Sequence, residues 1–312
     1  MGAEASHRDL LLLGASGQVG RAICAHDQLA PRVAIADRTS VDLTEPASIR
    51  SAIRSARPRW IVNAAAYTNV ELAEDEPERA FAANAVAPRV IAEEAQTVGA
   101  AVVHYSTDYV FDGKAREPYA ESAATAPLSV YAASKLDGER GIAESCERHV
   151  TIRTSWVYSE HGKNFLKTVL RLALERDKLT IVDDETGVPT AAHELAAVTA
   201  VIVASLDDVA ENDARWGLYH YAAAGATSRH AYAKDIVTQA SVRGFPLLAT
   251  PDSVIPVSSA AFPMKAERPG YSVLSTSKIE NAFGIAPPPW QDSVGQVLER
   301  LKTEAAPEAR HA

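Results

Sequence analysis

Tyr131 and Lys135 are the residues of this chain whose types and spacing most directly suggest chemistry. On a helix, residues four apart share a face, so this phenol and this ammonium would project into the same space. A free tyrosine titrates near ~10, but a fixed ammonium nearby favours the phenolate and would lower the pKa of Tyr131. The pair therefore suits proton transfer during carbonyl reduction. The same spacing also arises by chance on surface helices, so its meaning depends on its surroundings.

The elements around the pair alternate between short apolar runs and amphipathic stretches. Strands are expected at 10–13, 32–36, 60–62, 101–105 and 150–154. Helices are expected from the glycine turn to about residue 29 and over 77–98 and 128–144, the last carrying the pair. Strands joined by helices in this order predict an α/β fold with a Rossmann-type doubly wound parallel sheet.

The regular alternation loosens after residue 160, which predicts a second, smaller lobe. We expect a dinucleotide-binding domain over 8–160, to which segments near 180–220 return. A substrate-binding lobe over about 161–302 would be interleaved with it, and 303–312 would be a disordered tail.

A glycine loop, Gly14 to Gly20, directly follows the first expected strand. Gly14 permits a tight turn, Gly17 lets the backbone approach a pyrophosphate, and Gly20 lets the helix pack on the strand. Gln18 and Val19 open the helix, whose N-terminal N–H groups attract phosphate. This G-x-x-G-x-x-G spacing resembles that of the short-chain dehydrogenase/reductase superfamily and predicts dinucleotide binding. A glycine loop with only a structural role is the alternative.

The type of nicotinamide cofactor depends on the end of the second strand. Asp37 can accept hydrogen bonds from a ribose, which favours NADH, whereas Arg38 can meet the 2′-phosphate of NADPH. Both residues are present, so both cofactors are expected. Asp42 and Leu43 would flank the adenine, although Asp42 could equally cap the turn before Pro46.

Three further segments are expected at the carboxyl edge of the sheet, where doubly wound folds bind ligands. The small residues after the third strand would let the backbone pass close to the cofactor; the segment concerned is Ala65, Ala66, Tyr67 and Thr68. Thr107 would hydrogen-bond the substrate carbonyl, Tyr131 would protonate it, and Lys135 would hold the nicotinamide ribose. Asn84 could support a proton relay, or be a plain hydrogen-bonding residue.

A closer resemblance rests on motifs spread over both lobes. They are 63–68, 86–88, 104–113 (His-Tyr-Ser-Thr-Asp-Tyr-Val-Phe-Asp-Gly), 127–131, 153–158 and 163–165. Together they resemble the dTDP-4-dehydrorhamnose reductase family of extended short-chain dehydrogenases, from about residue 10 to residue 301. The resemblance implies reduction of the C4 ketone of dTDP-4-dehydro-L-rhamnose to dTDP-L-rhamnose by NADPH or NADH.

Further site residues follow from this resemblance. It implies a cofactor contact at Tyr105 and substrate contacts at Thr107, Asp108, Trp156 and Asn164. The Trp156 indole also offers an apolar face to a deoxysugar, with core packing as the alternative. Arg268 is the preferred anchor for the substrate diphosphate, because a planar guanidinium suits phosphate. For Lys163, Lys167 and Arg171, a solvated helix face is the simpler interpretation.

Composition narrows the partners and the setting. A net charge of -9 and a pI near 5.5, without a basic track, argue against a nucleic-acid partner. Cys24 and Cys146 lie far apart, which favours reduced thiols in the cytoplasm. No export signal, membrane span or metal-ligand set is expected. A homodimer is compatible with the sequence, which does not decide the oligomeric state.

Three alternative functions stay open at this stage. A nucleotide-sugar dehydratase is disfavoured because Tyr109, not a glutamate, follows Asp108; an epimerase is harder to exclude. A non-catalytic regulatory subunit, such as the related methionine adenosyltransferase beta subunit, would bind cofactor without turnover. A reductase of another nucleotide-linked 4-keto sugar would use the same residues.

Overall fold

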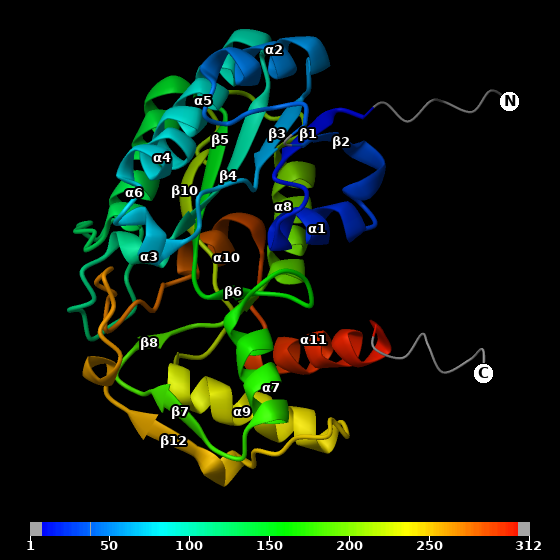
Figure 1. Ribbon diagram of the computed structural model, residues 1–312. Helices are drawn as coiled ribbons and strands as arrows, with labels where there is room; N and C mark the ends of the chain where they lie inside the picture. Colours follow the sequence, from blue (N-terminus) through cyan, green and yellow to red (C-terminus); the bar gives the residue numbers. More distant parts are fainter. Residues whose placement is uncertain (1–7, 38, 305–312) are drawn as a thin grey trace, which may run out of the picture.

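The computed structural model describes residues 8–37 and 39–304, and its centre is a six-stranded parallel sheet (Figure 1). Its strands are β1 (Leu10–Leu13), β2 (Val33–Ala36), β3 (Trp60–Asn63), β4 (Ala101–Thr107), β5 (His149–Thr154) and β10 (Gly217–His220). Their order is β10-β5-β4-β3-β1-β2, which confirms the predicted doubly wound α/β class. The order reverses beside β1, so a crevice opens at the carboxyl ends of β1 and β3.

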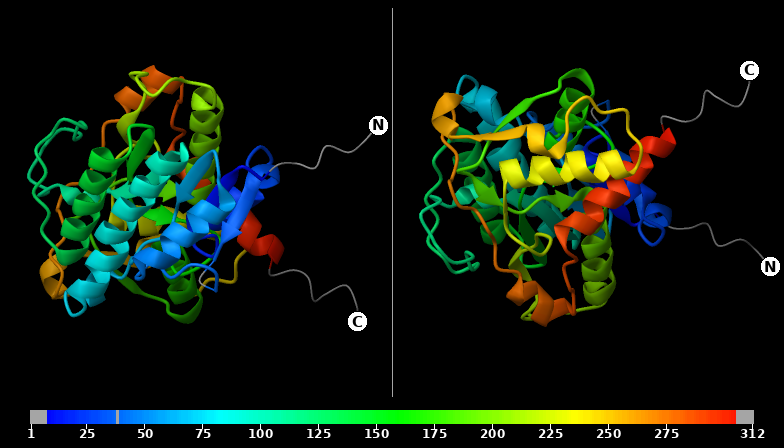
Figure 2. Two further views of the ribbon diagram at one scale, coloured as in Figure 1. Left: turned by 90° about the horizontal axis from the view of Figure 1, so that it is seen from above. Right: turned by 90° about the horizontal axis from the view of Figure 1, so that it is seen from below.

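Helices cover both faces of the sheet (Figures 1 and 2). One layer holds α2 (Pro46–Ala56), α4 (Pro77–Phe81), the π-helical turn η2 (Ala82–Val86), α5 (Ala87–Val98) and α6 (Val130–Ser145). The other holds α1 (Gln18–Ala25) and α8 (Ala192–Leu206). The strands alternate between the layers: Leu10 and Leu12 pack in the core under α8, whereas Leu11 and Leu13 pack in the core under α5.

Helix α3 (Val70–Ala73) packs against α6, and a second group of elements forms a smaller lobe below the carboxyl edge of the sheet (Figure 1). Its strands are β6 (Val157–Tyr158), β7 (Leu179–Val182), β8 (Thr186–Gly187), β9 (Thr190–Ala191), β11 (Thr227–Ser228) and β12 (Val254–Val257). Its helices are α7 (Phe165–Glu175), α9 (Arg229–Val242) and α11 (Trp290–Glu304), with α9 and α11 side by side in the view from below (Figure 2). A second hydrophobic core, which includes Tyr232, Trp290 and Leu166, holds this lobe together.

The two lobes exchange segments of chain. After α7, helix α8 and strand β10 return to the first lobe, and α10 (Ser277–Phe283) later packs beside β10. Both α8 and β10 fall in or near the predicted returning segment. Helix α11 continues to Glu304, past the expected start of the tail at residue 303, and the rest of that tail lies outside the described residues.

The helix predicted over 77–98 contains an irregular turn that the sequence did not indicate. The π-helical turn η2 widens the helix around Asn84 and presses the Asn84 carbonyl against Gly138 of α6. A Cβ at position 138 would lie 2.0 Å from that oxygen, so only glycine fits there. The close approach fixes α6, and with it Tyr131 and Lys135, against this layer.

Candidate active site

The glycine turn is shaped by its contact with the loop after β3. Gly14 has a φ of +83°, and a Cβ at this position would lie 2.6 Å from the Ala65 nitrogen, so a side chain is excluded twice over. The Gly17 N–H donates to the Gly14 carbonyl at 3.0 Å, and α1 begins at Gln18. The turn thus aims the N-terminus of α1 at the crevice.

A cleft of about 950 Å³ lies above this turn and runs along the carboxyl edge of the sheet. Most of the predicted site residues line it: Gly14, Gly17, Gln18, Val19, Asp37, Asp42, Leu43, Ala65, Ala66, Tyr67, Thr68, Tyr105, Thr107, Asp108, Tyr131, Lys135 and Trp156. The hydroxyls of Ser106 and Thr154 also face this edge and have no hydrogen-bond partner within 8–37 and 39–304. The turn has no side chain at Gly14 or Gly17, and the unpaired hydroxyls lie along the same edge. Together they fit a polar, phosphate-bearing ligand.

The expected adenosine end of the cleft is formed by two acidic turns. Asp37 Oδ1 accepts from the Thr39 N–H at 2.9 Å and its hydroxyl at 2.6 Å, and these bonds lower the pKa of Asp37. Asp42 Oδ1 holds Thr44 in the same way, as the turn interpretation expected. Arg38 lies outside the described residues.

The predicted reacting residues come from two adjacent elements. Thr107 ends β4, while Tyr131 and Lys135 lie in the first two turns of α6, which Ser129 caps by accepting from the Ala132 N–H at 3.3 Å. Burial raises the pKa of Tyr131, and the nearby Thr107 hydroxyl acts in the opposite direction. The structure therefore brings the three side chains together in the cleft.

One expectation about this cluster is wrong. Burial raises the pKa of Tyr131 above its usual value, and Lys135 is not among the groups that lower it. The Lys135 ammonium nitrogen instead donates to the Tyr105 carbonyl at 2.6 Å and lies 3.3 Å from His104 Nε2. Lys135 is itself buried, which lowers its pKa to about 8, and its nitrogen is directed at the Tyr105 carbonyl and His104 and not at the phenol.

Asp108 is a buried carboxyl at the floor of the cleft. It is 2% exposed and accepts hydrogen bonds from Ser155 at 2.8 Å and from Thr107 at 3.2 Å. Burial raises its pKa to about 6 in spite of these bonds. Its position beside Thr107 agrees with the predicted place near the substrate.

Trp156 is held in a strained backbone conformation, with φ at +44°. A Cβ on Gly187 would lie 2.6 Å from the indole, and the Arg229 guanidinium stacks on the ring at 3.5 Å. Trp156 is therefore fixed at the boundary of the two lobes, packed by its neighbours while still lining the cleft.

Four predicted site residues do not line the cleft. Gly20 sits behind the turn, where a Cβ would lie 2.1 Å from the Gly14 carbonyl oxygen. Asn84 is buried and bonds the Tyr67 N–H at 2.8 Å and the Ser134 hydroxyl at 3.0 Å, so it supports the loop instead of a relay. Asn164 caps α7 and donates to Gln18 at 2.8 Å. Arg268 pairs with Glu71 at 3.2 Å and is not part of the cleft lining.

Arg229 is a site residue that the sequence interpretation missed. It opens α9, is 14% exposed, lines the cleft, and lies 3.4 Å from the Tyr109 hydroxyl. Glu185 is 3.5 Å away and balances its charge only in part. No motif marks Arg229, because it reaches the cleft from a helix that begins far along the chain from Trp156. Lys163, taken as a solvated lysine, also lines the cleft.

Residues 8–37 and 39–304 meet the requirements of neither a metal site nor a membrane-crossing helix. Within these ranges no three His, Cys, Asp or Glu side chains come together in a way that could hold a metal ion. None of their helices is long and apolar enough to cross a membrane.

The sheet, the glycine turn and the Thr107, Tyr131 and Lys135 cluster define an oxidoreductase of the extended short-chain dehydrogenase/reductase class. The family model described as the RmlD substrate binding domain matches residues 8–303. The dTDP-4-dehydrorhamnose reductase of Escherichia coli K12 is 41% identical over 305 residues, which is 96% of this chain and 99% of the relative. The chain belongs to the dTDP-4-dehydrorhamnose reductase family.

Solved structures of the same family agree with this assignment. The Bacillus anthracis dTDP-4-dehydrorhamnose reductase, solved in complex with NADP, has a TM-score of 0.81 at 31% identity, covering 93% of this chain and 97% of its own. The Clostridium acetobutylicum protein has a TM-score of 0.83 at 31% identity, covering 94% and 99%. The predicted family is confirmed.

Proposed function

We propose that the protein reduces the C4 ketone of dTDP-4-dehydro-L-rhamnose to dTDP-L-rhamnose, using NADPH or NADH. The observation that carries the proposal is that Thr107, Tyr131 and Lys135 line one cleft with a glycine turn and with Trp156. Relatives about 40% identical over almost the whole chain have this reductase name, which supports the substrate.

The cofactor would lie between the glycine turn and the end of β4. The α1 N-terminus would meet its pyrophosphate, Asp37 its adenosine ribose, and Lys135 its nicotinamide ribose. The unpaired Ser106 and Thr154 hydroxyls offer further hydrogen bonds along the same edge. When bound, the nicotinamide supplies the hydride that reduces the ketone carbon. NADP in the Bacillus anthracis relative supports NADPH as one donor.

Tyr131 is the group that we assign to protonate the ketone oxygen. Because burial raises its pKa, the phenol carries its proton at neutral pH and is ready to act as an acid. Thr107 would steady the same oxygen, for which its hydroxyl must turn from Asp108 toward the substrate. The reaction consumes one hydride and one proton and leaves an alcohol at C4.

The substrate diphosphate needs a cation, and Arg229 is the one that we assign in place of Arg268. It lines the cleft beside Trp156, whereas Arg268 is paired with Glu71 outside the lining. A guanidinium held flat on an indole presents its edge N–H groups in a fixed plane, which suits phosphate oxygens. The exposed Lys163 at the cleft rim adds a second positive charge.

We also place this reaction in the cytoplasm. Cys24 and Cys146 are both free thiols in the structure, as the sequence predicted, which supports a reducing compartment. A homodimer is compatible with the sequence but not required by it, and sedimentation of the purified protein would test for one.

The test is NADPH or NADH oxidation with dTDP-4-dehydro-L-rhamnose, made in place by an upstream dehydratase and epimerase. We expect oxidation that depends on this sugar. Cofactor binding without oxidation would reject the reductase function and favour a regulatory subunit. Faster oxidation with a different nucleotide-linked 4-keto sugar would keep the reaction type and change the substrate.

A further inference from the structure

A chain of three buried polar side chains connects the cofactor loop to Lys135. Asn63 ends β3, His104 lies in β4, and Lys135 lies in α6; each is at most 2% exposed. Asn63 Nδ2 lies 3.1 Å from His104 Nδ1, and His104 Nε2 lies 3.3 Å from Lys135 Nζ. The buried imidazole thus lies between the Asn63 amide and the Lys135 side-chain nitrogen.

The hydrogen bonds fix which imidazole nitrogen carries the proton. Asn63 Oδ1 accepts from the Ala65 N–H at 3.2 Å, so its amide Nδ2 is the group that faces His104. Nδ2 can only donate, so Nδ1 of a neutral His104 must accept and the ring proton sits on Nε2. Burial lowers the pKa of His104, so the ring is neutral. His104 therefore points an N–H at Lys135.

An N–H directed at Lys135 discriminates between the two forms of that side chain. The ammonium has only donors and would meet the Nε2–H donor to donor, whereas the neutral amine has a lone pair that accepts it. Either form can still donate to the Tyr105 carbonyl at 2.6 Å. The contact with His104 thus favours the amine.

Burial is the largest influence on the protonation of Lys135, and the His104 contact acts in addition to it. The charged and titratable groups around this contact are few. On α6, Glu139 favours the ammonium, but it is paired with Arg153 of β5 at 2.7 Å. On the same helix, burial raises the pKa of Tyr131. From β5, His149 opposes a charge on His104, and burial lowers the pKa of His149 itself. From η2, Asn84 contributes no charge and contacts Ser134.

We propose that His104, oriented by Asn63, is a positioning residue that shifts the protonation equilibrium of Lys135 toward the amine and thereby lowers the upper pH limit of reduction. The inference rests on the proposed function for its catalytic consequence. Each turnover moves a proton from the Tyr131 hydroxyl to the ketone oxygen, so the Tyr131 phenolate must be reprotonated. Lys135 lines the same cleft, and we assign its ammonium as the acid that resupplies this proton from solvent. Above the pKa of Lys135, about 8, that supply declines.

The test measures Lys135 directly in the cofactor-free protein. NMR of selectively labelled lysines gives the pH inflection of the Lys135 side chain, assigned with a Lys135→Arg variant. In His104→Gln the amide oxygen can accept from the ammonium, so the inflection should rise by about one pH unit, the equivalent of one charged hydrogen bond. The alkaline limb of kcat should move by the same amount.

A second variant and a control keep the proposal falsifiable. Asn63→Leu frees the His104 tautomer, so Nε2 can accept and the inflection should again rise. His220→Gln replaces an equally buried imidazole in β10 that bonds the Tyr119 carbonyl, and should leave the Lys135 inflection unchanged. An unchanged inflection in either folded test variant would overturn the proposal. Failure of sugar reduction would not affect this titration, so the two proposals fail separately.

Discussion

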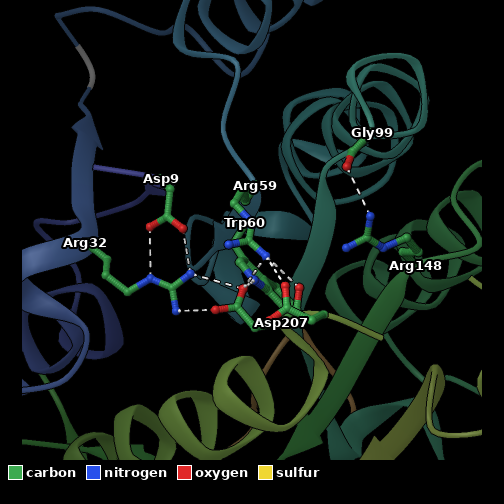
Figure 3. Close-up of polar contacts among 8 residues, drawn as sticks. Asp9, Arg32, Arg59, Trp60, Gly99, Arg148 and Asp207 are labelled. Carbon is green, nitrogen blue, oxygen red and sulfur yellow. Dashed lines mark hydrogen bonds and ion pairs between the residues drawn. The ribbon is translucent and has the colours of Figure 1, made fainter. Parts of the chain in front are cut away.

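The two edges of the central sheet treat their charged side chains in opposite ways. At the amino edge, where the strands begin, charged side chains form ion pairs with one another (Figure 3). At the carboxyl edge, where the same strands end, buried ionisable side chains have no oppositely charged partner in the part of the chain that the structure describes. Because each strand contributes to both edges, the difference lies in the residues that come just before and just after the strands. It shows which part of the sequence holds the fold and which part is kept for chemistry.

At the amino edge, Asp207 joins three elements. It accepts from Arg32 at 3.2 Å and from the Trp60 indole at 2.8 Å, and lies 3.4 Å from Arg59 (Figure 3). Arg32 also pairs with Asp9 at 2.6 Å. These contacts join the starts of β1, β2 and β3 to the end of α8. Paired and partly hydrated charges of this kind stabilise without shifting toward neutrality.

At the carboxyl edge, Lys135 and Asp108 are buried and form no ion pair with another side chain of 8–37 and 39–304. Burial lowers the pKa of one to about 8 and raises that of the other to about 6. Shifts toward neutral pH at a cleft are typical of residues that exchange protons with a substrate. The buried ionisable groups at the carboxyl edge thus lower the stability of the fold, and the ion pairs at the amino edge offset this loss.

Tyr131→Phe should have the largest effect and should act only at the carboxyl edge. Loss of the proton donor should lower kcat by about a hundred- to ten-thousand-fold, while cofactor affinity and Tm stay close to those of the unmodified protein. Steady-state kinetics and cofactor titration measure both. Tyr221→Phe, a buried tyrosine outside the cleft that bonds Glu194, should keep its rate. A Tyr131 variant with most of its rate intact would remove Tyr131 from its role.

Asp108→Asn should show that the unpaired carboxylate costs stability. A folded-state pKa of about 6, above the ordinary 3.8, means that the folded protein binds this proton more tightly than the unfolded chain. The stability that the protonated Asp108 carboxyl contributes is therefore fully present below pH ~4 and is lost as pH rises through about 6. The total loss in the free energy of unfolding is roughly 3 kcal/mol. In urea unfolding between these pH values, the stability of the unmodified protein should fall relative to that of the Asn variant, in which position 108 no longer titrates. Equal slopes would contradict a cost from this carboxylate.

Asp207→Ala should break the matched edge. It leaves Arg32 and the Trp60 indole without their shared acceptor, so the free energy of unfolding should fall by about 2 kcal/mol, with cofactor affinity unchanged. Asp208→Ala is the matched control, since Asp208 is 93% exposed although it lies 2.9 Å from Arg59, and should change stability little. Equal losses in the two variants would show that the Asp207 contacts add nothing.

Arg229→Gln should have a smaller effect, confined to ligand binding. One lost charged hydrogen bond predicts about tenfold weaker binding of dTDP, measured by calorimetry without cofactor or turnover. Arg268→Gln, whose cation is paired with Glu71, should leave dTDP affinity unchanged. The reverse result would restore Arg268 as the diphosphate anchor.

Local features allowed much of the fold and cleft to be predicted. The glycine turn, the alternation of strands and helices, and the pair Tyr131 and Lys135 are all short-range patterns, and the structure contains each of them. Thr107 followed because residues at the end of a parallel strand reach the same edge as the turn.

The remaining features depend on contacts between distant segments. Arg268 is held by Glu71, 197 positions away, and Arg229 meets Trp156 across the lobe boundary. The pKa shift of Tyr131 was wrongly predicted because spacing shows that two groups share a helix face but not which partners each one finds. Lys135 found the Tyr105 carbonyl and His104. The π-helical turn at Asn84 likewise depends on Gly138 of another helix.

Isotope transfer tests the proposed ketone reduction most directly. The protein is given dTDP-4-dehydro-L-rhamnose and NADPH deuterated at both C4 positions, and the nucleotide sugar formed is analysed by mass spectrometry and NMR. We expect dTDP-L-rhamnose with a single deuterium on C4 of the sugar. A product without deuterium, or with deuterium at another carbon, would show that hydride is not delivered to the C4 ketone.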